Sequence, residues 1–254
     1  MNVIDSNKKK LIQKTGLDKY YKALSWADYN KQMFDKLAPK YDAGNVLHSF
    51  GTKWKYDRLA MEKIVFPAKP SILDLCTGSG DIAIYLAEKY PASKVVALDA
   101  SLEMIKLAKK KACHLHNIEF IEGDALALPF DNETFDVVII SYGLRNLTSI
   151  EEGIQEMIRV TKKNGFVSSI DQGKPHNPLF NFIYKIYFYN IAPLIGKMVF
   201  HWGEYNTFRY LPESNKYFPH PNDLMLLFSK HGLKNVKNFD YLVGAIAQQL
   251  GQKI

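Results

Sequence analysis

The chain has 254 residues, is 47% hydrophobic and carries a formal net charge of +7, values that suit a folded protein with one full α/β domain. Its two cysteines lack metal-ligand spacing, so they exclude a disulfide framework, predict no metal site and favour the reducing cytoplasm. No secretory signal is visible and no apolar run reaches the ~18 residues needed to cross a bilayer, while the positive charge keeps an anionic membrane surface open as a partner.

The N-terminal quarter of the chain divides into two predicted segments. Residues 1–30 begin rich in lysine and predict an N-terminal arm. Residues 31–65 have apolar residues at helical spacing and predict lid helices that lead into the main domain. The sequence FPAKP at 66–70 is a short linker.

From residue 71 onward, short apolar runs alternate with helical stretches. A capping box of Ser149 and Glu152 starts the last of these helices, and Asn164-Gly165 is expected to end it. Alternating strands and helices predict a doubly wound, mostly parallel sheet with ligands at the carboxyl ends of its strands. The predicted strands are 71–76, 94–99, 118–122, 135–142 and 165–171, and the predicted helices are 80–90, 101–112 and 150–163.

Residues 176–218 interrupt the alternation and predict an inserted helical cap. Its aromatic stretch at 179–202 fits a packed subdomain, a greasy entrance for an isoprenoid tail, or a face that docks on a membrane. Residues 219–232 predict one more helix. Two final strands at 233–240 and 241–248 would form an antiparallel hairpin at the sheet edge and complete a seven-stranded sheet.

A glycine loop is the strongest local signal for function. The run SILDLCTGSG places Gly78 and Gly80 directly after the first strand, and Asp99 ends the next strand. This pattern is typical of a βαβ unit that binds a nucleotide, with the acid reaching the ribose hydroxyls. By itself the loop does not separate NAD from S-adenosylmethionine.

Three further features favour S-adenosylmethionine. Asp74 lies inside the first strand, where it can orient the loop or reach the amino group of a methionine moiety. Asp124 and Ala125 follow the third strand in GDALALPF and suit the adenine amine and ring. The fourth strand, which begins FDVVIIS, would end beneath the transferable methyl group.

Longer motifs carry a resemblance to a known family. They are DLCTGSGD, GDALALPF, MFDKLAPKYDAGNVLHSFG (33–51), SYGLRNLTS (141–149), IDQGKP (170–175) and YLPESNKYFP (210–219). Together they resemble the ubiquinone/menaquinone biosynthesis C-methyltransferase family, whose members are class I S-adenosylmethionine-dependent methyltransferases. The resemblance runs from about residue 30 to the C-terminus.

The resemblance implies a Rossmann-like fold, S-adenosylmethionine as cofactor, and methylation of a ring carbon of a polyprenylated quinol, either demethylmenaquinol or a ubiquinol precursor. It implies contacts of Arg145 and Asn146 with the quinol. Two departures leave the identity of the quinol open: Gln249 replaces a family histidine, and IDQGKP replaces the more usual EFSKP. With the loop residues above, the expected cofactor site is Asp74, Thr77, Gly78, Gly80, Asp99, Ala100, Asp124, Ala125 and Ser141.

The expected chemistry assigns roles to four polar side chains. A quinol carbon is a weak nucleophile until a neighbouring hydroxyl loses its proton, so a donor must stabilise the phenolate. Arg145 suits that task with Asn146, unless it forms only a surface ion pair. Tyr41 and His48 are candidate bases, although His48 also fits a structural, hydrogen-bonded role. Tyr142 could face the sulfonium or simply pack in the core.

Three other functions compete with this interpretation. One is methylation of O or N on another small apolar molecule. A nucleic-acid methyltransferase is disfavoured for two reasons. The chain lacks the tetrapeptide [DNS]-P-P-[YFW] that is usual for methylation of amino groups, and the predicted cap is not rich in arginine. The third is an NAD oxidoreductase or a non-catalytic binding module. We expect a cytoplasmic enzyme, compatible with a peripheral place on the inner face of the membrane and with a homo-oligomer.

Overall fold

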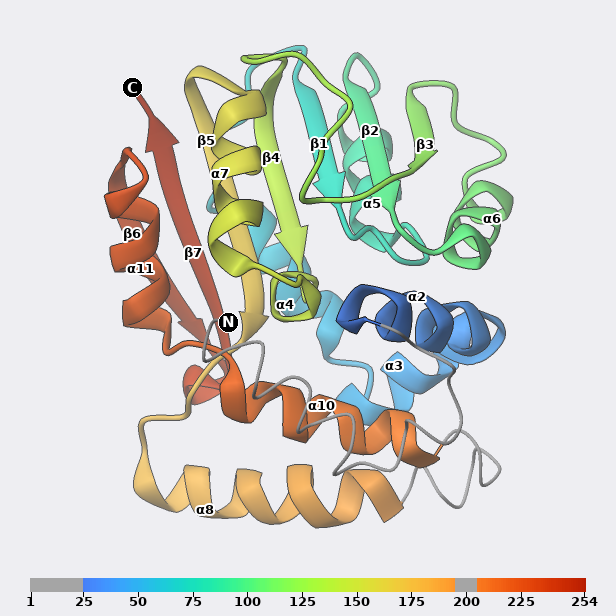
Figure 1. The fold of residues 1–254 in the computed structure, drawn as a ribbon, viewed down its shortest axis with the longest axis vertical. Coiled ribbons are helices and arrows are strands. Elements are labelled where there is room, and N and C mark those ends of the chain that lie inside the picture. The colour runs from blue at the N-terminus through green and yellow to red at the C-terminus, as the bar shows by residue number, and fades with distance from the viewer. Residues whose placement is uncertain (1–24, 195–204) are drawn as a thin grey trace.

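A seven-stranded sheet organises the computed structural model, which describes residues 25–194 and 205–254 (Figure 1). The strand order is β3-β2-β1-β4-β5-β7-β6, and β7 runs antiparallel to both of its neighbours while the other pairs are parallel. This confirms the doubly wound, mostly parallel fold. The strands are β1 (Ser71–Leu75), β2 (Lys94–Asp99), β3 (Ile118–Glu122), β4 (Phe135–Ser141), β5 (Thr161–Gln172), β6 (Leu233–Tyr241) and β7 (Ile246–Lys253).

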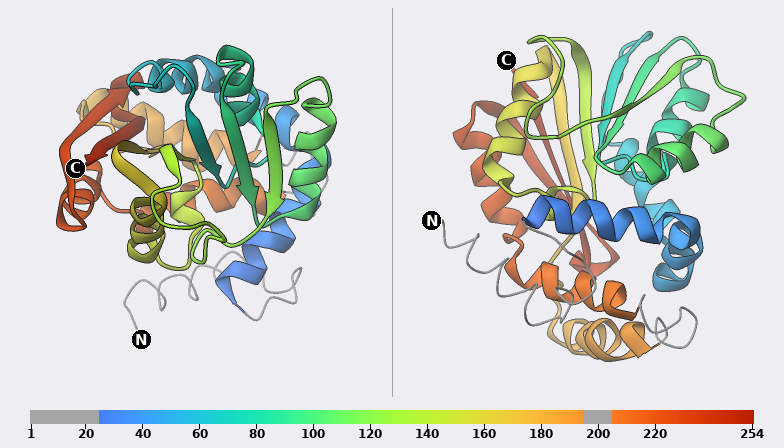
Figure 2. Two further views of the ribbon diagram at one scale, coloured as in Figure 1. Left: turned by 90° about the horizontal axis from the view of Figure 1, so that it is seen from above. Right: turned by 45° about the vertical axis from the view of Figure 1, so that its right-hand side comes forward.

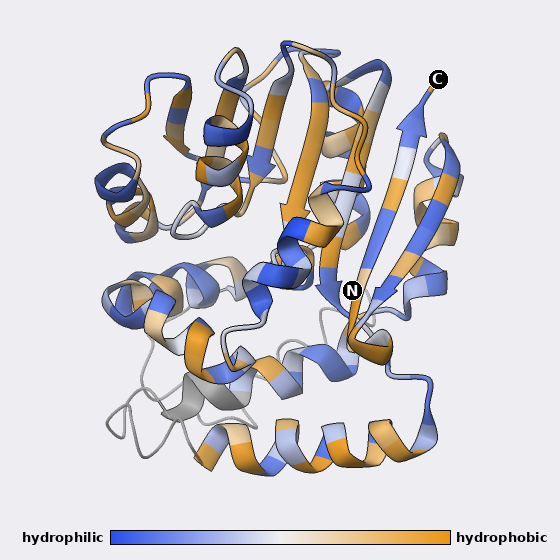
Figure 3. Ribbon diagram, turned by 180° about the vertical axis from the view of Figure 1, so that it is seen from behind, coloured by the Kyte–Doolittle hydropathy of each residue, from blue (hydrophilic) through white to orange (hydrophobic). Residues whose placement is uncertain are grey.

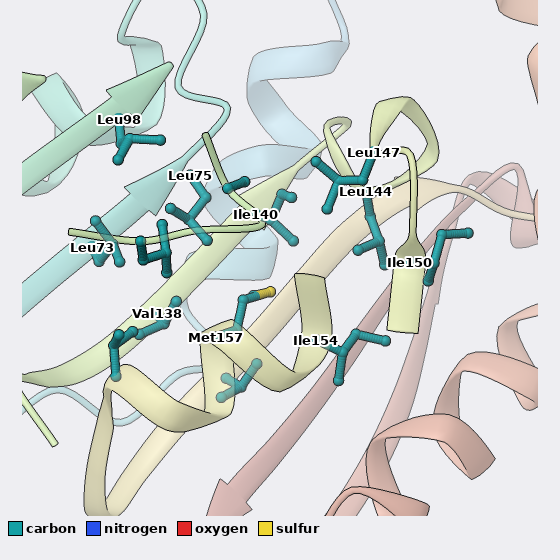
Figure 4. Close-up of a cluster of buried hydrophobic side chains, with 14 of the residues drawn as sticks. Leu73, Leu75, Leu98, Val138, Ile140, Leu144, Leu147, Ile150, Ile154 and Met157 are labelled. Carbon is teal, nitrogen blue, oxygen red and sulfur yellow. The ribbon is translucent and has the colours of Figure 1, made fainter. Parts of the chain in front are cut away.

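Both faces of the central strands are apolar, because helices cover the sheet on each side. Along β1, Leu73 points into a core with α7 (Ile150–Val160) and α11 (Pro221–Lys230), which Figure 4 shows in part. Its neighbour Ile72 points to the opposite core, with α4 (Lys53–Met61) and α5 (Asp81–Lys89). Burying each such side chain contributes about 1.5–3 kcal/mol.

The predicted lid and cap lie at the carboxyl ends of the parallel strands (Figures 1 and 2). The lid comprises α2 (Trp26–Leu37), a 3-10 turn η2 (Ala38–Lys40) and α3 (Tyr41–Ser49). The cap comprises α8 (Pro178–Ile186), a π-helical turn η4 (Tyr187–Ile191) and α10 (Tyr205–Tyr217). The lid and cap helices together form one layer that faces the strand ends, where ligands bind in such sheets.

The lid begins earlier than the sequence predicted. Helix α2 starts at Trp26, with Ser25 as its N-cap, so the arm boundary at residue 30 was wrong; residues 1–24 lie outside the described residues. Trp26 and Tyr29 are buried against Tyr210 of the cap, with ring centroids 5.8 and 6.0 Å away. This long-range aromatic contact orders the start of α2, and local sequence does not reveal it.

Two other predicted boundaries were wrong. Helix α7 ends at Val160, and β5 begins at Thr161 with an irregular register opposite β4, so Asn164 (φ 63°) lies inside the strand instead of ending the helix. The final strand spans 246–253, because Val243 (φ 55°) and Gly244 (φ 87°) form a turn within the apolar run that predicted a strand. The hairpin itself is confirmed.

The other elements follow the sequence closely. The predicted strands β2 and β3 match in full, and α6 (Leu102–Lys111) differs by one residue at each end. Ser149 accepts a hydrogen bond from the Glu152 amide, as the predicted cap requires. Across residues 25–194 and 205–254, no helix combines the length and the apolar character that spanning a membrane would require.

Candidate active site

The loop between β1 and α5 is shaped by three residues with positive φ. They are Cys76 (52°), Gly78 (56°) and Gly80 (82°). At Gly80 a side chain would also be crowded, because an added Cβ would lie 3.0 Å from Ala108 Cβ. Left-handed backbone in this run turns the loop tightly below the strand end and aligns its amides. The loop therefore has a geometry that lets a nucleoside or nucleotide approach the backbone closely.

Asp99 ties the loop to the end of β2. Its two carboxylate oxygens accept hydrogen bonds from the amides of Gly78 and Ser101, each at 2.8 Å. Burial raises the pKa of Asp99, and these amide hydrogen bonds act against that increase. Because a carboxylate has about four acceptor positions, Asp99 can still accept from ligand hydroxyls.

Asp74 is the second acid of the loop and is fully buried. One oxygen accepts from the Thr77 hydroxyl at 2.6 Å, which shows that Asp74 orients the loop. The other oxygen, Oδ1, has no partner among the described residues. Burial raises the pKa of Asp74 to about 7. A small cavity of about 20 Å³ is lined by Asp74 together with Lys53 and Tyr41, so a charged ligand group would meet both an acid and a cation there.

A large cavity of about 540 Å³ lies between the strand ends, the lid and the cap. It brings together ten of the thirteen predicted site residues, whereas Asp74 and Thr77 line the small cavity and Gly80 lines neither. Most of the cavity wall is apolar or aromatic. The ten residues are Tyr41, His48, Gly78, Asp99, Ala100, Asp124, Ala125, Ser141, Arg145 and Asn146.

Two polar residues, from the ends of β3 and β4, line the large cavity. Asp124, after β3, accepts from the Leu126 amide at 2.9 Å with Oδ1. Ser141, at the end of β4, has a buried hydroxyl without a partner among the described residues. A buried polar atom without a partner is costly, so Ser141 fits a ligand that supplies the missing hydrogen bond.

Arg145 is buried in the short turn η3 (Leu144–Asn146), so the alternative of a surface ion pair was wrong. Its guanidinium forms an ion pair with Asp171 at the end of β5, and the two side chains are 6% and 2% exposed. Burial is the largest single effect and lowers the Arg145 pKa, but the Asp171 carboxylate together with Tyr210 and Tyr41 leaves that pKa raised. The Arg145 Nε has no partner among the described residues, so this donor is available to a ligand.

Asp171 was not among the predicted site residues. It also accepts a hydrogen bond from the Gln172 amide at 2.7 Å and thereby fixes the end of β5. The signal was present in the sequence, since an acid at the carboxyl end of a parallel strand occupies the same kind of position as Asp99.

Asn146 joins three parts of the chain. Its backbone carbonyl accepts from Trp26 Nε1 at 2.8 Å, and its side-chain Oδ1 lies 2.6 Å from the Tyr210 hydroxyl. The same hydroxyl lies 2.9 Å from Asn30 Oδ1. Lid and cap therefore both hold the segment that carries Arg145, and Tyr210 is a further residue that the sequence did not reveal.

The two candidate bases come from α3 and are both uncharged at neutral pH. Burial, with a smaller effect of the Arg145 charge, lowers the pKa of His48 to about 4. Burial raises the pKa of Tyr41. The His48 Nδ1 is buried without a partner among the described residues, so His48 is not the fully hydrogen-bonded structural residue of the alternative interpretation. Neutral His48 can accept a proton, whereas Tyr41 offers a hydroxyl.

Three other residues of interest differ in their relation to the cavity. Gln172 lines it, with a buried amide oxygen that has no partner among the described residues. The Tyr142 ring also lines it and lies 5.0 Å from Lys53 Nζ and 5.8 Å from the Arg145 guanidinium. Gln249, the expected departure from the family, instead donates to Asn238 Oδ1 at 2.7 Å on the edge hairpin and does not line the cavity.

Polar contacts hold the lid over the loop. Asp42 of α3 accepts from the Ser79 hydroxyl at 2.6 Å and pairs with Lys111 at 3.0 Å. Asp35 of α2 accepts from the Ser101 hydroxyl at 2.6 Å. Because Ser79 and Ser101 follow β1 and β2, these contacts position the lid and the glycine loop together.

Sequence comparisons identify relatives over most of the chain. A model of the ubiE/COQ5 methyltransferase family matches residues 23–253. A demethylmenaquinone methyltransferase from Thermus thermophilus is 36% identical over 79% of this chain and 90% of its own length. A ubiquinone/menaquinone biosynthesis C-methyltransferase UbiE from Geotalea uraniireducens is 34% identical over 88% of this chain and 95% of its own. The resemblance found in the motifs is confirmed.

Comparison of folds gives the same class. A SAM-dependent methyltransferase from Aquifex aeolicus superimposes with a TM-score of 0.60 at 17% identity, over 87% of this chain and 98% of its own. At that identity the similarity concerns the fold alone, and it confirms the expected Rossmann-like methyltransferase architecture.

Proposed function

We propose, because this chain belongs to the ubiE/COQ5 methyltransferase family, that it transfers the methyl group of S-adenosylmethionine to a ring carbon of a polyprenylated quinol. The names of its relatives, which include demethylmenaquinone methyltransferase, support demethylmenaquinol or a ubiquinol precursor as the substrate. The observation that carries the proposal is one mostly apolar cavity that contains both the nucleotide-type acids and the buried Arg145.

The residues present fit S-adenosylmethionine. Asp99 would accept from the ribose hydroxyls, and Asp124 from the adenine amine, with Ala125 beside the ring. The unpartnered Oδ1 of Asp74 would accept from the methionine ammonium, and the unpartnered hydroxyl of Ser141 would bind nearby. When bound, S-adenosylmethionine supplies an electrophilic methyl group on a sulfonium. The contacts of Asp74 and Ser141 would satisfy polar atoms that are buried without a partner among the described residues.

Arg145 would stabilise the negative charge that develops on the quinol oxygen. It remains protonated because its pKa is raised, so it acts as a donor and not as a base. In enzymes that stabilise a developing negative charge with hydrogen bonds, removing one such donor lowers kcat by about 10²–10³-fold. Gln172 would hydrogen-bond the second ring oxygen, since its amide is buried in the same cavity without a partner for its oxygen.

The proposed reaction releases one net proton, because two protons leave the substrate in sequence and one returns to the ring oxygen. A ring hydroxyl loses its proton as the new carbon–carbon bond forms and the sulfur–methyl bond breaks, and the methylated ring carbon then loses its hydrogen as a proton while the oxygen is reprotonated. Neutral His48 lines the cavity and would receive a proton, with water as the final acceptor because a pKa of about 4 makes His48 a weak base.

We extend the proposal to the location of the enzyme. A polyprenyl tail stays in the bilayer, so the enzyme would act as a peripheral protein on the cytoplasmic face of the membrane. The net charge of +7 supports this by attraction to anionic lipid.

The test is methylation of demethylmenaquinol by the full chain under reducing conditions, with an isotopically labelled methyl group. We expect the label on a ring carbon by mass spectrometry, and no product when the quinone is left oxidised. A product labelled on oxygen would refute C-methylation. Calorimetry should detect binding of S-adenosylhomocysteine, and binding of NAD instead would refute the cofactor.

Mass spectrometry of cellular quinones after deletion of this chain would identify the natural substrate. Accumulation of a demethylated naphthoquinone would favour demethylmenaquinol, and accumulation of a demethylated benzoquinone would favour a ubiquinol precursor. Unchanged quinones would contradict the proposal.

A further inference from the structure

The outer side of α8 is an apolar stripe exposed to solvent. Leu179, Phe182, Ile183 and Ile186 occur at the i, i+3, i+4, i+7 spacing of one helix face and are 71%, 64%, 55% and 42% exposed. Figure 3 shows α8 as a largely hydrophobic helix at the outer edge of the molecule. Four large apolar side chains on one exposed face are unusual for a surface that contacts only water.

The inner side of the same helix is also apolar. Phe180 and Tyr184 line the large cavity, and so do Tyr187 and Phe188 in the π-helical turn that follows. A helix that is apolar on all sides is normally buried. Since α8 covers the cavity with one side, no element among residues 25–194 and 205–254 provides its other side with the cover that such a composition predicts.

The cavity reaches the surface beside this stripe. Three large apolar residues both line the cavity and are exposed: Ile183 on α8, Phe50 after α3 and Leu242 before β7. The Phe50 ring lies 5.3 Å from the Tyr187 ring, which places it next to the end of the cap helix. An apolar rim therefore surrounds an opening into an apolar cavity.

The charges around the stripe favour one kind of cover. Residues 172–194 contain no Asp or Glu, and Lys185 on α8 is exposed. A lysine side chain beside an apolar stripe can place its stem along the acyl region and its ammonium among the headgroups. The nine-residue length of α8 is far short of the ~20 residues that span a bilayer, so it suits a helix that lies in the interface.

We propose that the docking face, defined as the exposed stripe of α8 with Phe50 and Leu242, inserts into the surface of an anionic bilayer and opens the cavity directly onto the acyl region. The occupant is the bilayer itself. A long apolar tail could then remain in the membrane while its head group enters the cavity, an arrangement that builds on the proposed function. Lipid binding by this face does not depend on which reaction is catalysed.

The experiment is flotation of the full chain with vesicles of phosphatidylcholine and phosphatidylglycerol, without substrate. The variant Leu179→Glu changes a residue that does not line the cavity, and the matched control Leu226→Glu changes a leucine of α11 that is 69% exposed. Both add the same charge. We expect Leu179→Glu to lower vesicle binding by at least about tenfold and Leu226→Glu by less than about twofold, because only the former places a carboxylate in the acyl region.

Two further measurements keep the result interpretable. Circular dichroism and binding of S-adenosylhomocysteine should be unchanged in Leu179→Glu, which excludes a folding defect. Methylation of a quinol with a truncated, water-soluble tail should also be unchanged, whereas methylation of a vesicle-embedded quinol should fall with vesicle binding. If neither the wild type nor Leu179→Glu methylates any quinol but flotation follows the prediction, the proposed reaction is wrong and the docking face is supported.

Specific results would overturn the docking face. Equal flotation of the two variants would show that binding is not centred on α8. A wild-type chain that does not float but forms a dimer in light scattering, which Leu179→Glu dissociates, would show that a second copy covers the stripe.

Discussion

The buried pair of Arg145 and Asp171 yields the sharpest prediction. The substitution Asp171→Asn keeps the shape of the side chain but removes its charge, and the Arg145 guanidinium stays protonated in a site where it is 6% exposed. Breaking a buried ion pair by removing one partner typically costs about 3–5 kcal/mol. Because Asn can still accept one hydrogen bond, we expect a loss of about 3 kcal/mol in the free energy of unfolding, near the lower end of that range.

Urea unfolding at neutral pH, followed by circular dichroism and tryptophan fluorescence, measures this loss as a shift in midpoint at a constant m-value. The exposed acid Asp131 provides the control, since Asp131→Asn should change stability by less than about 0.5 kcal/mol. A loss for Asp171→Asn no larger than that of the control would refute the reasoning, because it would mean that Arg145 does not depend on Asp171 for its charge.

The same variant separates positioning from cofactor binding. Asp171 does not line the cavity, so affinity for S-adenosylhomocysteine should stay within about threefold, a change smaller than the loss of one neutral hydrogen bond. Turnover should fall by about 10²-fold, because Arg145 loses the partner that orients it. Asp171→Glu restores the charge and should recover part of the activity. If Asp171→Asn instead raised KM by about 10²-fold and left kcat unchanged, a role of Asp171 in orienting Arg145 would be contradicted.

Three other predictions concern buried polar residues. The pKa of Asp74 is raised to about 7, so the native state keeps this proton to higher pH than the unfolded state does. The free energy of unfolding should therefore fall by about 4 kcal/mol as the pH rises from about 4 to 7. The variant Asp74→Asn should lack this dependence in urea unfolding at several pH values, and a pH profile parallel to that of the wild type would contradict the prediction. The pKa of His48 is lowered to about 4, so its contribution to the free energy of unfolding is fully present above about pH 6.5. About 3 kcal/mol of stability should be lost as the pH falls from there to about 4. The variant His48→Gln should flatten the acid side of the profile of stability against pH, and an unchanged acid side would show that His48 titrates normally. The variant Gln172→Leu should raise KM for the quinol by about tenfold with little change in cofactor affinity, because it loses one hydrogen bond to a ring oxygen. Steady-state kinetics measure this change, and an unchanged KM would show that Gln172 does not contact the substrate.

Much of the fold could be predicted from the sequence because its signals are local. Apolar runs ending in glycine or an acid, separated by amphipathic stretches, specify the parallel strands and their helices through side-chain period and turn chemistry. The motif around Gly78 and the acids Asp99 and Asp124 lie directly after strands, so topology alone brings them to one edge of the sheet. The family resemblance carried by the longer motifs rests on the same contiguous segments.

The boundaries that failed are those where distant contacts outweigh local preference. Helix α2 starts at Trp26 because Tyr210, far along the chain, packs against it. The last strand begins at Ile246 because the turn at Val243 and Gly244 interrupts a continuous apolar run. Sequence pattern reports which residues avoid water, but it does not report which partner buries them.

The site itself was decided by tertiary structure. Arg145 and Asp171 are 26 residues apart, and Asn146 meets Tyr210 across 64 residues, distances at which spacing along the chain carries no geometric information. Gln172 faces the cavity while Gln249 lies on the edge hairpin, a difference set by strand register. Residue types and local periods could therefore identify the chemistry, whereas burial and partners, which set the charge of each group, follow only from how distant segments pack.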